Sequence, residues 1–530
     1  MLLPFRAAAL PADIADFTLT QAIAALRRRT IRPREVIAAA MRRHAENSHS
    51  GAFISAAYEV LLEGWAHDTA ADAPLAPVSL HGMPIAVKDN VHVAGFANTA
   101  GTPGLAGFRP GRDATVIRRL REAGALLVGK TNMHELSLGV TSHNAHFGDV
   151  RNARDPSRLA GGSSGGSAVA VALGLAYAAI GTDTAGSIRI PAALNGIVGL
   201  RPTVGRYPAD GVAPVSPTRD TPGPMARTVA DVALVDQVIT GSQRPIVPVR
   251  PERIRLGVVR GFFFEGLDVQ VHQLIHAALQ RLQDSGVQLI ELRMPELGTL
   301  SETAGTAIGF AEFWPAMEHY LRTHDTGLSM ADVARAAAGS DVRALIENFL
   351  APGSPHGVTP EGYETALRTH RPALRRLFLE QFCRHKLDGI VLPTTIAVAG
   401  CLSSAGGVVE LNESPVSANY AYLRNTLPAS NAGLPGLTLP AGYTAQGQAV
   451  GIEIDGPPHA DRQLLSIGLT LESILSVPAR WQAAADYPPM AVLARATSAQ
   501  GTSCRSAAAG SPASRFNRAS TASAAARPIS

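Results

Sequence analysis

The sequence predicts an α/β layered fold with a mixed central sheet, and three observations support this. The chain has 530 residues, 46% of them hydrophobic and 17% charged, which is enough to bury a large core. Short apolar runs typical of buried strands occur along it. These runs alternate with longer stretches whose apolar residues recur at helical spacing. Such alternation favours helices layered against a sheet.

The first half of the chain alternates helices and strands. Helices are expected over residues 19–28, 33–44, 113–122 and 168–179. Strands are expected over residues 84–88 and 125–128. Asp113 is the expected N-cap of its helix, and Gly124 the residue that closes it. Residues 151–167 have loop composition and end in GGSSGGS, and the loop GTDTAGS follows the fourth helix.

The second half begins with a βαβ-like unit. Its expected strand, helix and strand are residues 254–259, 269–284 and 287–292. Residues of about 300–385 are expected to be mostly helical. The remaining expected strands are 389–392, 437–439 and 450–454, and the last helix is 461–474.

The net charge of +4 belongs to the C-terminal segment. Residues 491–530 carry five Arg and no acid, which leaves 42 basic against 43 acidic residues before them. The same segment holds 13 Ala and 8 Ser and one aromatic residue, so it cannot bury enough apolar surface to order itself. We therefore expect one domain over residues 1–490, a disordered tail over 491–530, and no nucleic-acid partner.

Cysteine content and apolar runs bear on location. Cys383, Cys401 and Cys504 are too few for a disulfide framework, and no CxxC occurs. The longest apolar run, residues 168–180, is too short to span a bilayer, and the N-terminus is a poor signal peptide. We expect a cytoplasmic protein with no membrane partner.

Lysine is rare in this chain. Of 47 basic residues only Lys88, Lys130 and Lys386 are lysines. Arginine stays protonated, whereas a buried lysine can lose its proton and act as a base. Each lysine therefore deserves inspection.

Two motifs suggest functions that their context disfavours. Residues 124–131, GALLVGKT, match the phosphate-binding P-loop, but ALLV has the character of a strand and cannot wrap a phosphate. Residues 161–165, GGSSG, match the nucleophile elbow, but no strand precedes them and none of the 16 His is a distinctive partner.

A third candidate combines Lys88, Ser163 and Ser187. Serine needs a positioned base to become a nucleophile, and a neutral lysine can be that base. Ser163 lies in GGSSGGS, and Ser187 ends GTDTAGS, whose small residues allow backbone amides to converge on one point. Taken singly, these elements are better explained as a flexible linker and a surface lysine.

A long stretch adds a resemblance to the amidase signature family. Residues 161–203 resemble that family's Gly/Ser-rich loop, small-residue helix and D-x-x-G-S-[IV]-R-x-P segment. Residues 81–90, 129–148 and 423–442 are similar to further family segments, so the likeness covers roughly residues 18–480. It implies the amidase-signature α/β/α fold, amide hydrolysis and no cofactor.

The resemblance also implies roles. Ser187 would be the nucleophile, Lys88 the base, and Ser163 the bridging serine, whose preceding peptide bond is cis in the family. The oxyanion would be held by the amides of Thr184, Ala185, Gly186 and Ser187. Supporting positions would be Ser164, Asp183 and Arg189, although a structural salt bridge explains Arg189 equally well. Ala185 departs from the family's glycine and would be strained if its φ were positive.

Within the family, the motifs look most similar to indoleacetamide and mandelamide hydrolases. This implies a small-molecule substrate, a primary amide of arylacetamide type, cleaved to acid and ammonia. By the same resemblance, the helical segment over about 300–385 would be an insertion that covers the substrate pocket. The expected apolar pocket residues are Met133, Phe310, Phe313 and Trp314, for which ordinary core packing is the alternative.

Other functions stay open at this point. Ala185 also fits enzymes acting on urea-type, allophanate- or biuret-like substrates, and the A subunit of glutamyl-tRNA amidotransferase shares the fold. A metal site is not expected, because His134, Glu135, His143 and His146 match no trusted ligand spacing. The sequence leaves a homodimer open.

Overall fold

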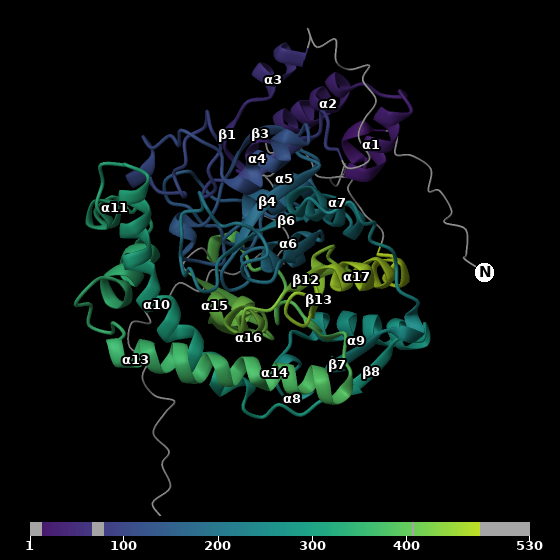
Figure 1. The fold of residues 1–530 in the computed structure, drawn as a ribbon, viewed down its shortest axis with the longest axis vertical. Helices are drawn as coiled ribbons and strands as arrows, with labels where there is room; N and C mark the ends of the chain where they lie inside the picture. The colour runs from purple at the N-terminus through teal and green to yellow at the C-terminus, as the bar shows by residue number, and fades with distance from the viewer. Residues whose placement is uncertain (1–12, 66–78, 405–406, 478–530) are drawn as a thin grey trace, which may run out of the picture. The chain divides into compact units, whose positions relative to one another are not determined.

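The predicted mixed α/β architecture is confirmed by a computed structural model, which describes residues 13–65, 79–404 and 407–477. Its centre is an 11-stranded sheet surrounded by helices (Figure 1). The tail expected over 491–530 lies outside the described residues. None of the described helices is long and apolar enough to cross a membrane.

The strands of the large sheet are β1 (Phe53–Ala56), β2 (Pro84–Lys88), β3 (Leu126–Thr131), β4 (Ala178–Asp183), β5 (Val198–Arg201), β6 (Thr221–Ala226), β7 (Arg255–Val258), β8 (Gln288–Glu291), β9 (Gly389–Pro393), β12 (Gly436–Tyr443) and β13 (Ala449–Asp455). Their order is β1-β3-β2-β4-β6-β5-β12-β13-β9-β7-β8. Strand β2 pairs parallel with β3 and β4, and β7 pairs parallel with β8 and β9. Each pairing along the sheet from β4 to β9 is antiparallel. Strands β10 (Val408–Leu411) and β11 (Ser414–Ser417) form a separate hairpin.

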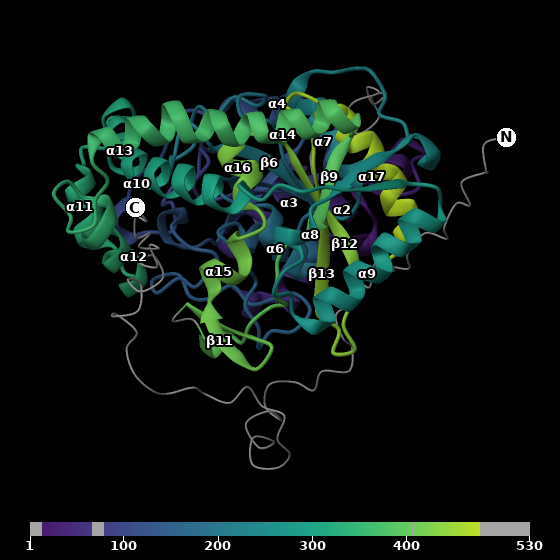
Figure 2. The same cartoon turned by 90° about the horizontal axis from the view of Figure 1, so that it is seen from below.

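The α-helices are α1 (Leu19–Arg27), α2 (Pro33–Glu46), α3 (Tyr58–Trp65), α4 (Thr115–Glu122), α5 (Gly165–Ala172), α6 (Arg189–Asn195), α7 (Val229–Thr240), α8 (Arg260–Phe263), α9 (Val269–Asp284), α10 (Leu297–Thr323), α11 (Met330–Ala336), α12 (Ser340–Leu345), α13 (Pro360–Thr365), α14 (Arg371–His385), α15 (Ala418–Leu423), α16 (Leu427–Ala432) and α17 (Asp461–Leu475). Helices α9 and α17 lie on one side of β12 and β13, and α6 lies on the other (Figure 2).

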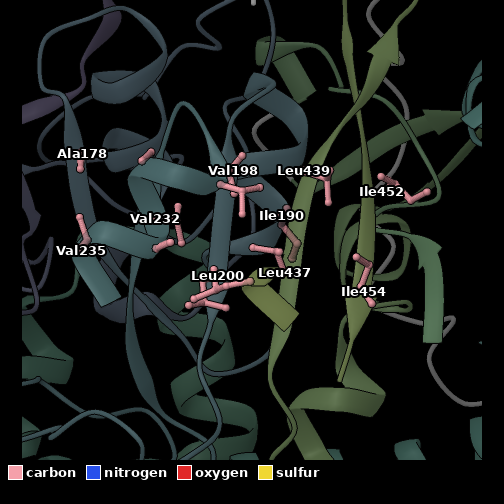
Figure 3. Close-up of a cluster of buried hydrophobic side chains, with 14 of the residues drawn as sticks. Ala178, Ile190, Val198, Leu200, Val232, Val235, Leu437, Leu439, Ile452 and Ile454 are labelled. Carbon is pink, nitrogen blue, oxygen red and sulfur yellow. The ribbon is translucent and has the colours of Figure 1, made fainter. Parts of the chain in front are cut away.

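Strand alternation gives the two faces of the sheet's middle different chemistry. Leu437, Leu439, Ile452 and Ile454 join the apolar core that α7, α9 and α17 cover (Figure 3). The residues between them, including Glu453, face the other way and are fully buried with polar side chains. Because buried charges need partners, this second face must contain a compensated polar network.

Helices α10 to α14 confirm the mostly helical segment expected over about 300–385. Apolar side chains of α10, α11 and α12 pack with Leu136, in the segment that follows β3, and with Ala213, in the segment between β5 and β6. The helical segment is thereby attached to two of the connections between strands of the sheet.

Two local predictions are wrong. The helix expected over 168–179 ends early: α5 stops at Ala172, and Gly174 has φ +76°. Residues 178 and 179 already belong to strand β4. An Ala-rich run without polar residues has no period that separates a buried helix from a buried strand. Asp113 does not cap α4: it accepts from Ala94 N–H and Arg121, and Asp210 accepts from Thr115 N–H instead.

Candidate active site

The predicted site residues meet at the carboxyl ends of two parallel strands. Lys88 ends β2, and Asp183 ends β4, two strands that are direct neighbours in the sheet. Ser163 and Ser164 immediately precede α5, which packs on both strands. Ser187 lies between β4 and α6. The carboxyl edge of parallel strands is where α/β proteins commonly place ligand sites.

Lys88 is fully buried and is held by hydroxyl groups. Its Nζ donates to Ser163 Oγ at 2.8 Å and to Thr182 Oγ1 at 2.7 Å. Burial lowers the pKa of the Lys88 amine to about 7, although the charges of Asp183 and Asp220 oppose this shift. A substantial fraction of Lys88 is therefore neutral near pH 7 and has a lone pair for a proton.

The backbone around Ser163 is fixed from two sides. The Gly162–Ser163 peptide bond is cis, as in the family that the sequence resembles. The Ser163 carbonyl accepts from His134 N–H at 3.2 Å and from Ser142 Oγ at 3.3 Å. Ser142 Oγ in turn accepts from Gly165 N–H at 3.0 Å. These contacts hold the Ser163 hydroxyl against Lys88.

Ser187 lies beside the two serines before α5. Ser164 N–H donates to the Ser187 carbonyl at 3.1 Å, and Ser187 is 7% exposed. Among the hydrogen bonds of the described residues, none joins Ser163 Oγ to Ser187 Oγ. Catalytic hydrogen bonds often form only when substrate is bound, so the lack of this bond does not conflict with proton transfer between Ser187 and Ser163.

A buried ionic network braces the loop that carries Ser187. Asp183 pairs with Arg189 at 3.0 Å and with Arg201 at 2.9 Å, and all three side chains are fully buried. Both guanidinium groups hold the pKa of Asp183 well below its usual range, against the effect of burial. Arg189 also pairs with Glu453 at 2.5 Å. For Arg189, the supporting role and the structural salt bridge are therefore the same thing, because its salt bridges are the contacts that hold the loop of Ser187.

The backbone amides before Ser187 are not equivalent. Asp183 Oδ1 accepts from Gly186 N–H at 2.8 Å, so that amide already has a partner. In the described part of the chain, no acceptor is found for the amides of Thr184, Ala185 and Ser187. Of the four amides that the family resemblance assigns to an oxyanion, three thus have no acceptor among the described residues.

Ala185 fits its position without strain. Its φ is not positive, whereas Gly186 has φ +135°. A Cβ on Gly186 would meet Thr426 Oγ1 at 2.3 Å, so glycine is required there. The strain that a positive φ would cause at Ala185 is therefore absent.

Three polar residues near the site were missed from sequence. Thr182 Oγ1 contacts Lys88 and accepts from Asn90 Nδ2 at 3.1 Å. Thr184 Oγ1 donates to Asp220 Oδ1 at 2.5 Å. Thr182 stands inside GTDTAGS and Asn90 two residues after Lys88, so their motifs could have indicated them. Nothing in the surroundings of Asp220 in the sequence marks it.

The expected pocket residues divide into two kinds. Phe313 and Met133 are 0% exposed and pack inside the protein, so neither lines an open pocket. Phe310, Trp314 and Val215 are half-buried and pack against the apolar core of α10 to α12. Of the four expected pocket residues, only Phe310 and Trp314 therefore keep accessible apolar surface.

The competing motifs have structural roles. Residues 126–131 of the P-loop match are strand β3 itself, and Lys130 is buried in an ion pair with Asp89 at 3.1 Å. His134 and His143 pair separately, with Asp341 and Asp149. Within the described ranges, no group of three or more His, Cys, Asp or Glu could hold a metal ion.

The chain is similar to known amide hydrolases over most of its length. The Amidase family model matches residues 35–465. Mandelamide hydrolase from Pseudomonas putida is 43% identical over 487 residues, which cover 89% of this chain and 94% of that protein. Indoleacetamide hydrolase from Agrobacterium vitis is 41% identical over 76% of this chain and 85% of that protein. The native peptide amidase from Stenotrophomonas maltophilia is 30% identical, with a TM-score of 0.74 over 88% of this chain and 98% of that structure. A family match of this extent, with relatives above 40% identity, establishes that the protein belongs to the Amidase family and is an amide-hydrolysing enzyme.

Proposed function

We propose that this enzyme hydrolyses primary amides of arylacetamide type to a carboxylic acid and ammonia, through an acyl intermediate on Ser187. The observation that carries the mechanism is the environment of Lys88. Its amine is buried, has a pKa lowered to about 7 and contacts the Ser163 hydroxyl at 2.8 Å. A neutral amine in this position is the base that a serine nucleophile needs.

The first half of the reaction forms the acyl enzyme. Ser163 gives its proton to Lys88 Nζ while it accepts the proton of Ser187. Ser187 Oγ forms a bond to the amide carbonyl carbon, and the carbonyl π bond breaks to give an oxyanion. The donors available to it are the amides of Thr184, Ala185 and Ser187, for which the described residues supply no acceptor. The oxyanion then collapses, the C–N bond breaks, and the leaving nitrogen takes a proton from Ser163, which Lys88 reprotonates.

The second half releases the acid. Water gives a proton to the Ser163–Lys88 pair, adds to the acyl carbonyl and forms a second oxyanion. Its collapse breaks the bond to Ser187 Oγ, which recovers its proton through Ser163. The sum is one amide and one water converted to one acid and one ammonia. No metal or organic cofactor enters these steps.

The arylacetamide assignment rests on relatives and on side chains. The two hydrolases above, named for mandelamide and indoleacetamide, are 43% and 41% identical to this chain. Phe310 and Trp314 offer aromatic surface at the border of the α10 core, which suits an aromatic acyl group. These relatives do not favour the alternatives that the sequence left open, urea-type substrates and glutamine.

The test is ammonia release from a panel of amides. The panel contains mandelamide, indole-3-acetamide, benzamide, short aliphatic amides, allophanate and glutamine. Arylacetamides should give the highest kcat/KM, and preference for allophanate or glutamine would contradict the substrate assignment. Ser187→Ala should abolish release, whereas Ser473→Ala, at an exposed position of α17, should not change it. Near-wild-type turnover by Ser187→Ala would refute the mechanism.

A further inference from the structure

One carboxylate near the site has no part in the proton relay. Asp220 follows β5 and directly precedes β6, and its carboxylate joins two separate segments of chain. Asp220 Oδ1 accepts from Thr184 Oγ1 at 2.5 Å. Asp220 Oδ2 accepts from Val215 N–H at 2.8 Å and Ser216 N–H at 2.9 Å. One oxygen of Asp220 thus binds the loop between β4 and α6 that carries Ser187, residues 184–188, which we call the nucleophile loop. The other oxygen binds the turn over residues 215–220, to which Asp220 itself belongs.

The Asp220 turn is itself anchored to the helical segment. Ser216 Oγ donates to Glu312 Oε2 at 2.6 Å, and Thr218 Oγ1 donates to the same oxygen at 3.0 Å. Glu312 lies on α10 and is 7% exposed. The turn therefore has a fixed position against which Asp220 can hold Thr184.

The nucleophile loop is held differently at its two ends. Asp183 binds the amides of Gly186 and Ile188, which fixes the end nearer to α6. Thr184 and Ala185 are more exposed, and their amides have no acceptor among the described residues. Two side-chain contacts tie this part of the loop to the body of the protein. Thr426 Oγ1 donates to the Ala185 carbonyl at 2.6 Å, and the Thr184 hydroxyl donates to Asp220, which is the contact that holds Thr184 itself.

We propose that Asp220 is a positioning residue for amide hydrolysis: through the Thr184 hydroxyl it aims the Thr184 and Ala185 amides at the oxyanion. This rests on the proposed acyl-Ser187 mechanism and adds a residue to it. Backbone donors stabilise an oxyanion only when they already point at it, and the loss of one donor typically lowers kcat by about 10²–10³-fold. Asp220 touches neither substrate nor reacting atoms, so its contribution is to geometry.

The charge of Asp220 has a second consequence. The charged groups that act on Lys88 are Asp183 and Asp220, and both favour its protonated form. Removing the Asp220 charge should therefore make Lys88 easier to deprotonate. Removing only the Thr184 hydroxyl leaves that charge in place, so the two changes can be told apart.

The primary test compares Thr184→Val with Thr184→Ser, using the best amide of the panel. Valine has the shape of threonine without the hydroxyl, and serine keeps the hydroxyl. Thr184→Val should lower kcat about tenfold or more with KM within about twofold, because the oxyanion exists only after attack. Thr184→Ser should retain kcat within about threefold. Equal kcat for wild type and Thr184→Val would overturn the proposal.

The second variant is Asp220→Asn, which keeps the shape and removes the charge. It should lower kcat at least as much as Thr184→Val. The acid limb of its kcat/KM profile should also move to lower pH than in wild type, where we expect the Lys88 pKa of about 7 to set it. Thr184→Val should leave that limb in place. An unshifted limb in Asp220→Asn, or a loss of kcat matched by an equal rise in KM, would contradict the positioning role.

The Ser187→Ala variant distinguishes a failure of this inference from a failure of the acyl-Ser187 mechanism on which it rests. If Ser187→Ala is inactive and Thr184→Val is fully active, only the role of Asp220 fails. If Ser187→Ala is active, the acyl-Ser187 mechanism fails first. Should Asp220→Asn not fold, the Thr184 pair still decides, because Thr184 is half-buried and both its replacements are smaller or equal in size.

Discussion

Two buried lysines on adjacent strands have opposite roles. Lys88 ends β2 and Lys130 is near the end of β3, and both side chains are buried. Lys130 Nζ lies 3.1 Å from Asp89 Oδ1 and donates to Asn98 Oδ1 at 2.9 Å. Lys88 contacts hydroxyls, and no carboxylate within the described residues lies at ion-pair distance from it. Burial lowers both lysine pKa values, so what distinguishes a base from a structural cation is its partner.

Sheet register separates the two lysines. Val87 pairs with Lys130, and Lys88 pairs with Thr131, so successive residues direct Lys88 and Lys130 to opposite faces. Thr131 Oγ1 contacts Ser167 of α5, on the side of the serine loop. A shift of one residue in β3 would turn Lys130 to the face on which Lys88 lies.

The largest expected effect is on catalysis at Lys88. Lys88→Met removes the base but fills similar space, so kcat/KM should fall between about 10²- and 10⁴-fold. The fold should remain, since no buried carboxylate loses its ion pair. Steady-state kinetics and the melting temperature measure the two effects. An active Lys88→Met variant would remove the distinction between the lysines.

Lys130→Met should show the reverse. It leaves the Asp89 carboxylate buried without its cation, which typically costs roughly 3–5 kcal/mol of unfolding free energy. Denaturant unfolding measures this loss. The protein that remains folded should keep kcat within about threefold of wild type. Normal stability together with lost activity would place Lys130 in the chemistry instead.

The pH dependence of stability should also differ. Between pH 7 and 10.5 the unfolded chain keeps the Lys88 proton that the folded chain has lost, so folding becomes more favourable as pH rises. Relative to Lys88→Met, wild type should gain about 1.4 kcal/mol of unfolding free energy per pH unit in this window. Denaturant curves at pH 7, 8 and 9 test this. Parallel pH profiles for the two proteins would contradict it.

The third lysine gives the smallest effect. Lys386 is exposed and closes α14 with φ +50°, a conformation that glycine adopts more easily. Lys386→Gly should raise the unfolding free energy by about 0.5–1 kcal/mol and leave kcat unchanged. Thermal unfolding checks the first effect and ammonia release the second. A fall in kcat would show that lysine substitutions affect the site unspecifically.

Local patterns predicted much of the fold. The strand over residues 84–88 and the helix over 269–284 have the expected bounds, because apolar runs and helical periodicity define them. The run over 168–179 was misassigned because it contains only small and apolar residues. The cap of α4 was also misassigned, since Asp210 lies far from it in the sequence.

The candidate site shows the same division. Lys88, Ser163 and Ser187 lie in motifs that a family resemblance identifies, and the structure brings their segments together. Asp220 is 36 residues from its partner Thr184. Such a pairing depends on how β4, β5 and β6 are arranged, which residue patterns do not encode.

The protonation of Lys88 can be measured directly, because the chain has only three lysines. Labelling lysine with ¹³C at Cε gives three NMR signals, and Lys88→Met identifies the one from Lys88. We predict that this signal titrates with a pKa of about 7. A Lys88 signal that stays that of an ammonium group up to pH 10 would contradict the account.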